Sequence, residues 1–187
     1  MYFPSRPHDI ASHCPHVQHL EYVLMIVDQH EVASFSSPSP YRLHFMQQDF
    51  DWPSPIIPFT SCTSLAIYNT GKSLMINKLV QFAPSAQDLT LSTITINDHV
   101  VSAINALSQL QSLHLNNATI TNFEGINLPQ LMLISLTMTK INPKNLDHLL
   151  AGTPSLQEIS LRGKKTRADL KDLREQLASH HPDIKVA

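Results

Sequence analysis

The sequence predicts an α/β fold in which about seven similar units stack into a solenoid, each contributing a strand and a connection. Two observations support this prediction. One spacing of apolar residues returns every 21 to 25 residues along the chain, and a proline stands two positions before most copies. Several segments between the copies also carry apolar residues at helical spacing. A unit with one apolar side cannot bury that side alone, so stacking of the units forms the core.

The repeated pattern is an apolar residue, two variable residues, a second apolar residue, one variable residue and a third apolar residue. Its clearest copies are APSAQDLTL (83–91), LSQLQSLHL (107–115), LPQLMLISL (128–136) and TPSLQEISL (153–161). CPHVQHLEY (14–22) has the same pattern, and SPYRLHF and SCTSLAI are weaker copies at the expected places. The first apolar position, which we call the leading position, holds in turn Val17, Pro40, Cys62, Ala86, Leu110, Leu131 and Leu156.

Prolines divide the chain in the same way. Two residues before a leading position stand Pro15, Pro38, Pro84, Pro129 and Pro154. Proline lacks an amide hydrogen and fixes φ, so we expect each one to end any preceding helix and to begin an extended approach to the strand. We therefore expect one domain, residues 1–187, with repeats at about 15–37, 38–59, 60–83, 84–107, 108–128, 129–153 and 154–181 and a partial strand at 182–187.

Helices are expected in several connections. Residues 98–107 place four apolar side chains on one helical face. Asn142 and Pro143 suit an N-cap and the first helical position that follows it. Thr166 and Asp169 suit a capping box at the start of a C-terminal helix.

The remaining connections are expected to differ from one another. Residues 74–82 have a helical pattern, whereas residues 23–39 and 46–60 are expected to be irregular, the latter because of its three prolines. The connection at 121–129 is too short for a long helix.

These copies resemble the leucine-rich repeat, L-x-x-L-x-L, over nearly the whole chain. The resemblance implies a curved solenoid with a parallel sheet on its concave face and helices and loops on its convex face. The chain departs from the family pattern at the position three residues after the strand, where the family usually has Asn or Cys. That position holds Ile94, Ala118, Thr139 and Lys164, so the resemblance does not extend to a buried asparagine ladder.

Two copies, HCPHVQHLEY and AGTPSLQEISL, are similar to the repeats of F-box/leucine-rich-repeat proteins, the substrate receptors of cullin-type ubiquitin ligases. No F-box is found before the first repeat, so a ligase adaptor is expected as a partner only if an F-box is supplied elsewhere. Our leading expectation is non-catalytic recognition of a protein partner through the concave face. The alternative is a substrate-receptor fragment of a ubiquitin ligase.

The N-terminal histidine cluster raises a second alternative, a metal-binding protein, because His13, Cys14, His16 and His19 are zinc-binding residue types. In the repeat frame they fall on a helix end, a bend and a strand, whereas a tetrahedral site needs them to converge. We therefore expect no metal and no cofactor. Cys62 is at a leading position, so we expect it in the core. No glycine-rich phosphate loop and no paired carboxylates occur, and we expect no enzymatic activity.

The variable strand positions of successive repeats should form three columns on the concave sheet, because strand side chains alternate between faces. The first column is His19, Arg42, Ser64, Asp88, Ser112, Leu133 and Glu158. The second column is Glu21, His44, Ala66, Thr90, His114, Ser135 and Ser160. The third column is Val23, Met46, Tyr68, Ser92, Asn116, Thr137 and Arg162.

Small uncharged side chains occupy the middle of this face, and larger groups flank them. Tyrosine and arginine are residue types that carry interface energy, and they occur among the flanking groups. We predict that the partner-binding residues are Arg42, His44, Tyr68, Asp88, His114, Asn116, Glu158 and Arg162.

The net charge of −2 gives no electrostatic support for binding to nucleic acid or to an anionic membrane. The two cysteines cannot form a disulfide framework, which fits a reducing compartment. The N-terminus lacks the apolar run of a signal peptide, and the longest apolar run, residues 22–27, is far too short to span a membrane. We therefore expect a cytoplasmic or nuclear protein.

Overall fold

The chain forms a parallel sheet with helices on one side, which confirms the predicted α/β class. The computed structural model describes residues 20–24, 41–46, 62–68, 76–77, 80–81, 83–163, 171, 174–175, 177, 179 and 181–187. One sheet has the strand order β1-β2-β3-β4-β6-β8-β9-β10, with every neighbouring pair parallel. Its strands are β1 (Leu20–Leu24), β2 (Tyr41–Met46), β3 (Ser64–Tyr68), β4 (Asp88–Ser92), β6 (Ser112–Asn116), β8 (Leu133–Thr137), β9 (Glu158–Arg162) and β10 (Lys185–Val186).

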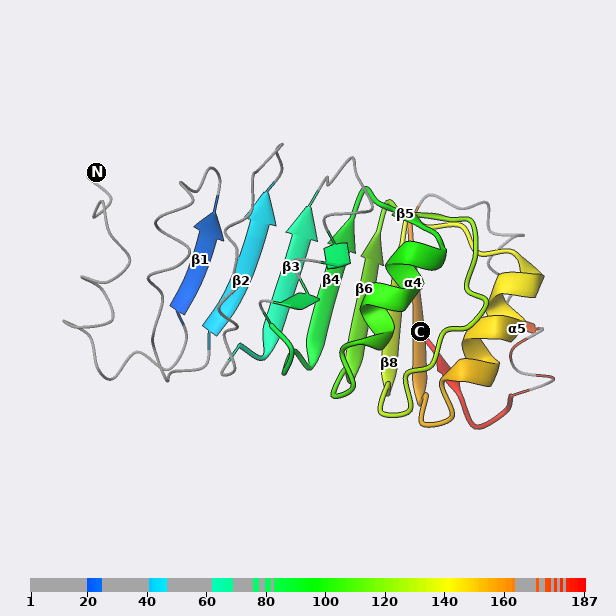
Figure 1. Ribbon diagram of the computed structural model, residues 1–187. Coiled ribbons are helices and arrows are strands. Elements are labelled where there is room, and N and C mark those ends of the chain that lie inside the picture. Colours follow the sequence, from blue (N-terminus) through cyan, green and yellow to red (C-terminus); the bar gives the residue numbers. More distant parts are fainter. Residues whose placement is uncertain are drawn as a thin grey trace.

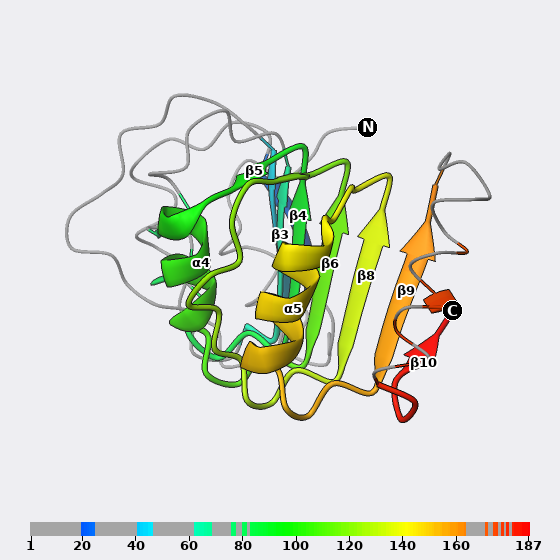
Figure 2. The ribbon, with the colours of Figure 1, turned by 90° about the vertical axis from the view of Figure 1, so that its right-hand side faces the viewer.

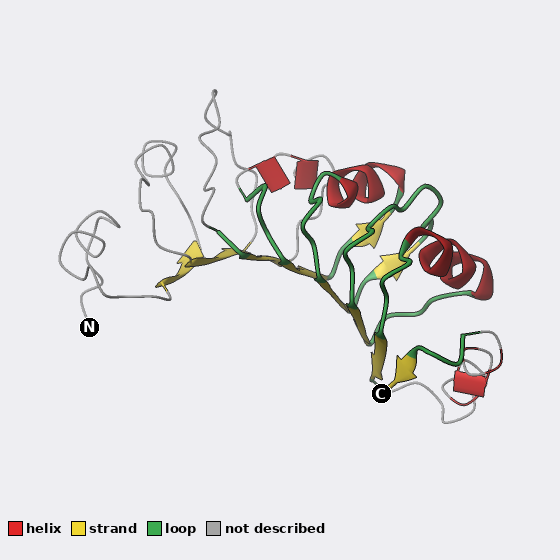
Figure 3. Cartoon of the chain, turned by 90° about the horizontal axis from the view of Figure 1, so that it is seen from below, coloured by secondary structure: helices red, strands yellow, loops and turns green. Residues whose placement is uncertain are grey.

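The sheet is curved, and its described helices lie on one face. Strands follow one another across the sheet in sequence order (Figure 1). The two helices α4 (Asp98–Asn105) and α5 (Pro143–Gly152) pack on the same side of the strands (Figure 2). Seen along the edge of the sheet, the strands form an arc with these helices on its convex side (Figure 3). The concave side is left uncovered by the described elements.

A small second sheet lies on the convex side, where β5 (Thr95–Ile96) pairs in parallel with β7 (Thr119–Ile120). Strand β5 begins a few residues after β4, and β7 begins a few residues after β6. Each of these two repeats has one further apolar residue at this place. Ile96 and Ile120 are buried there. The sheet therefore ties adjacent repeats together a second time, behind the main strands.

Pro84, Pro129 and Pro154 lie in tight turns, which corrects the expected extended approach. The amide of the leading residue after each of them donates to the carbonyl three residues earlier, from Ala86 to Ala83 (3.0 Å), Leu131 to Leu128 (3.1 Å) and Leu156 to Thr153 (3.1 Å). Proline is then the second residue of a four-residue turn, where its fixed φ fits and its missing amide hydrogen costs nothing. The expectation that proline follows a helix end is confirmed at α5, which ends at Gly152 just before Pro154.

The register from β2 to β9 confirms the predicted columns. Successive strands pair Arg42 with Ser64, Ser64 with Asp88, Asp88 with Ser112, Ser112 with Leu133 and Leu133 with Glu158. The second and third columns follow in the same way, from His44 to Ser160 and from Met46 to Arg162.

Strand β1 differs from the prediction. Glu21 pairs with Arg42 and Val23 pairs with His44, so this strand lies two residues out of the predicted frame, which had Glu21 beside His44. The physical reason is the period of two along a strand. A shift by two residues exchanges no side chains between the two faces, so the apolar pattern is equally compatible with both registers.

Both helices begin at asparagine caps. The side chain of Asn97 accepts a hydrogen bond from the Val100 amide (3.2 Å) at the start of α4. The side chain of Asn142 accepts one from the Asn145 amide (2.8 Å), and Pro143 follows in the first turn of α5 as predicted. Such caps satisfy amides that have no partner within the helix.

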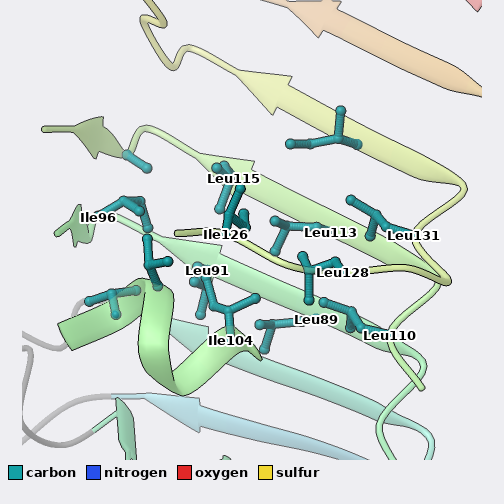
Figure 4. Close-up of a cluster of buried hydrophobic side chains, with 14 of the residues drawn as sticks. Leu89, Leu91, Ile96, Ile104, Leu110, Leu113, Leu115, Ile126, Leu128 and Leu131 are labelled. Carbon is teal, nitrogen blue, oxygen red and sulfur yellow. The ribbon is translucent and has the colours of Figure 1, made fainter. Parts of the chain in front are cut away.

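The apolar residues of the strands and helices meet in one core on the convex side of the sheet (Figure 4). The leading residues described by the structure are buried, Cys62 among them. Ile104 on α4 packs over the strand leucines, as its helical spacing predicts. The labelled core residues are Leu89, Leu91, Ile96, Ile104, Leu110, Leu113, Leu115, Ile126, Leu128 and Leu131.

The connection between β7 and β8 contains no helix, as its length predicts, and asparagine side chains hold it in place. Asn105, at the end of α4, donates to the Gly125 carbonyl (2.8 Å) and accepts from the Asn127 amide (2.9 Å). Asn145, on α5, accepts from the buried Phe123 amide (3.1 Å). This irregular segment is therefore bonded to the helices on either side of it.

Several expectations concern residues outside the described part of the chain. These are the capping box of Thr166 and Asp169 and most of the segments 23–39 and 46–60, which were expected to be irregular. At the start of those segments the expectation was wrong, because Val23 and Leu24 belong to β1 and Met46 belongs to β2. Residues 76–77 and 80–81 are helical, in agreement with part of the helix expected over 74–82. Leu177 is helical and buried, and β10 confirms the partial strand expected over 182–187.

Candidate functional site

The three columns lie on the concave face of the sheet. On β4, Leu89 and Leu91 are completely buried in the core on the convex side. Side chains alternate along a strand, so Asp88, Thr90 and Ser92 point to the opposite face. The same holds on β6, β8 and β9, where core residues alternate with column residues along the strand.

The middle of the concave face is made of small uncharged side chains, which we call the small-residue patch. Its members lie on neighbouring strands from β3 to β8, which are about 4.8 Å apart, and the larger Leu133, His114 and Asn116 stand among them. The patch positions themselves carry no large side chain, so the backbone of the sheet lies close to the surface there. The patch consists of Ser64, Ala66, Thr90, Ser92, Ser112, Ser135 and Thr137.

Polar groups within the third column are connected across strands. The Asn116 side-chain nitrogen donates to the Ser92 hydroxyl, with 3.4 Å between the two atoms. Ser92 is buried, at 8% exposure, because Asn116 and Tyr68 stand beside it on the neighbouring strands. Asn116 therefore holds a defined orientation at the edge of the patch.

Of the predicted aromatic and histidine residues, Tyr68 flanks the patch and His114 stands within it. Tyr68 is at the end of β3, next to Ser92, and is partly exposed. His114 lies at the centre of the second column, between Thr90 and Ser135, and is also partly exposed. The strand β2 places Arg42 and His44 in the first and second columns by its pairing with β3.

From β3 to β10, charge on the concave face is confined to four side chains. Glu158 in the first column lies beside Lys185 of β10, and Lys185 Nζ is 3.0 Å from Glu158 Oε2. The opposite charges of this pair offset each other. Asp88 in the first column and Arg162 in the third make no ion pair with any other described residue.

Sequence reasoning placed all eight predicted residues correctly in their columns but left out Lys185. Each of the eight does take its predicted position in the register, and Lys185 extends the first column by one strand. The signal for Lys185 was the partial strand at 182–187, since the strand pattern continues there. Its pairing makes Glu158 part of an ion pair rather than an isolated anchor.

The remaining candidates from the sequence were Cys62 and the N-terminal histidine cluster. Cys62 is buried, and its thiol donates to the Ser64 carbonyl (3.3 Å), which confirms its predicted place in the core. The histidine cluster of residues 13–19 lies outside the described residues. In the part of the chain that the structure describes, no three His, Cys, Asp or Glu side chains gather where they could hold a metal ion. No helix among those residues is long and apolar enough to cross a membrane.

Comparison with known proteins adds no further assignment: no protein-family model matches the chain, and no curated protein matches it significantly.

Proposed function

We propose that this chain is a leucine-rich repeat solenoid that recognises a protein partner, without catalysis, through the concave face of its sheet. The repeated strands, their parallel pairing and the helices on the convex side support the solenoid. One observation carries the function. Three columns of side chains are in register across a curved face that no described element covers.

The chemistry of that face suits a polypeptide. The small-residue patch allows a partner backbone to approach the sheet closely, and its hydroxyl groups can donate and accept hydrogen bonds. His114 and Asn116 add polar groups within the same area. Tyr68 and Arg162 stand at its borders, and both residue types are common at sites that contribute most to binding.

Selection from a displayed library of random peptides tests the proposal with a defined probe. Ser135 lies in the patch on β8, and Ser102 lies exposed on α4, on the convex side. Tyrosine at either position adds the same bulk without adding charge. We expect Ser135→Tyr to lower the affinity for selected peptides at least tenfold and Ser102→Tyr to leave it unchanged.

A second variant removes two larger side chains of the face. The double substitution Tyr68→Ala and His114→Ala should also lower the affinity, because it removes side chains at the border and centre of the face. Circular dichroism and thermal unfolding establish that each variant is folded. If selected peptides bind all the folded variants equally well, recognition does not occur on the concave face.

A further inference from the structure

We infer that the concave face binds an extended peptide segment with one basic side chain opposite Asp88 and one acidic side chain opposite Arg162, about six residues apart. Uncharged residues lie between these two in the segment. The inference rests on the proposed function and specifies the ligand of the same surface.

The charges of the face support this choice. The carboxylate of Glu158 is engaged by Lys185, and the members of the small-residue patch are uncharged. On the strands from β3 to β10, the charges left without an ion-pair partner among the described residues are Asp88 and Arg162. A partner that matches the face electrostatically therefore presents one positive and one negative group over an otherwise uncharged stretch.

The register fixes how far apart those two groups must be. Asp88 begins β4 and Arg162 ends β9, three strand steps away across β6 and β8. Three steps of about 4.8 Å and four residues of about 3.3 Å give a diagonal of roughly 20 Å. An extended chain covers that distance in about six residues, whereas an α-helix needs about 13.

The size of the face favours a short segment over a folded domain. The eight strands of the described sheet span at most about 38 Å by 17 Å, or roughly 650 Å². A stable interface between two folded proteins takes about 800 Å² from each partner. The small side chains also let an extended backbone lie close to the sheet, where serine and threonine hydroxyls can reach its amides and carbonyls.

The arginine gives the segment its orientation. A guanidinium group binds a carboxylate through two parallel hydrogen bonds, which is stronger and more directional than a single contact. Arg162 is exposed at the end of its strand, so an incoming carboxylate can approach it. Asp88 is partly exposed at the opposite corner, so the basic residue of the segment lies at the β4 end of the diagonal and its acidic residue at the β9 end.

Peptide selection with charge-swapped proteins tests this. The probe is a displayed library of random peptides about 16 residues long, which accommodates both the extended and the helical spacing. The wild-type chain should enrich peptides with a basic and an acidic residue about six positions apart. The variant Asp88→Lys should instead enrich two acidic residues at this spacing, and the variant Arg162→Glu two basic residues.

The ion pair of the first column provides a matched control. The double variant Glu158→Lys and Lys185→Glu also reverses charges on this face, but it reverses them within an existing pair. It should enrich the same peptides as the wild-type chain. Single neutral variants, Asp88→Asn and Arg162→Gln, should each weaken binding about three- to tenfold, with the loss shrinking as salt is added.

Each result bears on one of the two proposals. Peptides that bind and are lost with Ser135→Tyr, but show no charge preference, would overturn this inference and leave the proposed function standing. A spacing of about 13 residues would replace the extended segment by a helix and likewise overturn it. If no enriched peptide loses affinity when Ser135 is replaced by tyrosine, both the proposed function and this inference are overturned.

Discussion

The hydroxyl oxygen of Thr139 accepts a hydrogen bond from the backbone amide of Ala118 in the preceding repeat, with 3.1 Å between the two atoms. The hydroxyl hydrogen lies within reach of two carbonyl oxygens, Leu115 at 3.0 Å and Thr137 at 3.1 Å. Thr139 is completely buried, so water does not compete for these groups. One side chain thus joins the turns that follow β6 and β8.

Replacing Thr139 by valine should destabilise the chain by about 1–3 kcal/mol. Valine keeps the shape of threonine but leaves the Ala118 amide without its acceptor in a buried place. Chemical denaturation measures the change, and Thr119→Val, an exposed position in the same turn, provides the control. A loss equal to that of the control would show that the hydroxyl contributes nothing.

Alanine at Gly152 should destabilise the chain by about 3 kcal/mol or more. A Cβ atom there would lie 2.0 Å from the carbonyl oxygen of Ile126, and the two backbones are held together because the Leu128 amide donates to the Gly152 carbonyl (2.8 Å). Helix propensity alone would make the alanine variant more stable by about 1 kcal/mol. A loss of stability, measured by chemical denaturation, therefore indicates the steric clash, and a gain indicates that propensity dominates.

Gly125→Ala is the comparison for Gly152→Ala. A Cβ at Gly125 meets no atom within 4 Å, but its φ of +75° is unfavourable for alanine. We expect a cost of about 1–2 kcal/mol, from backbone strain alone. Equal losses at the two glycines, measured by chemical denaturation, would contradict the close approach of α5 to residue 126.

Asparagine at Thr93 should stabilise the chain by about 1 kcal/mol. Thr93 directly follows β4 with a φ of 60°, and Asn117 follows β6 at the equivalent place with a φ of 51°. A β-branched side chain is strained in this left-handed region, and asparagine tolerates it. Thr95→Asn, on the extended strand β5, should give no gain, and a gain there equal to that at Thr93 would remove the conformational explanation.

Removing the ion pair between Glu158 and Lys185 should change the stability by less than about 1 kcal/mol. The Lys185 side chain is 71% exposed, so water and salt screen the attraction. Glu158→Gln measured by chemical denaturation at low and high salt tests this. A larger loss that persists in high salt would show that β10 depends on the pair for its attachment.

The repeat spacing and strand alternation were sufficient to predict β4, β6, β8 and β9 and the columns they carry. Each of these strands has two core residues separated by one column residue, and the alternation leaves one arrangement that buries the leucines. The register of β1 was not determined in this way, because a shift of two residues preserves the alternation.

Other features depend on contacts between distant residues, which the sequence pattern does not contain. The absence of asparagine three residues after the strands predicted that no buried asparagine ladder joins the repeats. Thr139 supplies a polar bridge at one of those positions, and only its approach to Ala118 reveals it. Similarly, the asparagines of the connection before β8 look like ordinary loop residues until their partners on α4 and α5 are known.

Mapping a bound peptide onto the chain tests the central claim most directly. A peptide selected for binding is titrated into the full-length protein, and the backbone amide shifts are followed by NMR. The account predicts that the largest shifts fall on the column positions of β4, β6 and β8, including Thr90, His114 and Ser135. Shifts gathered on α4 and α5, with the concave strands unchanged, would contradict it.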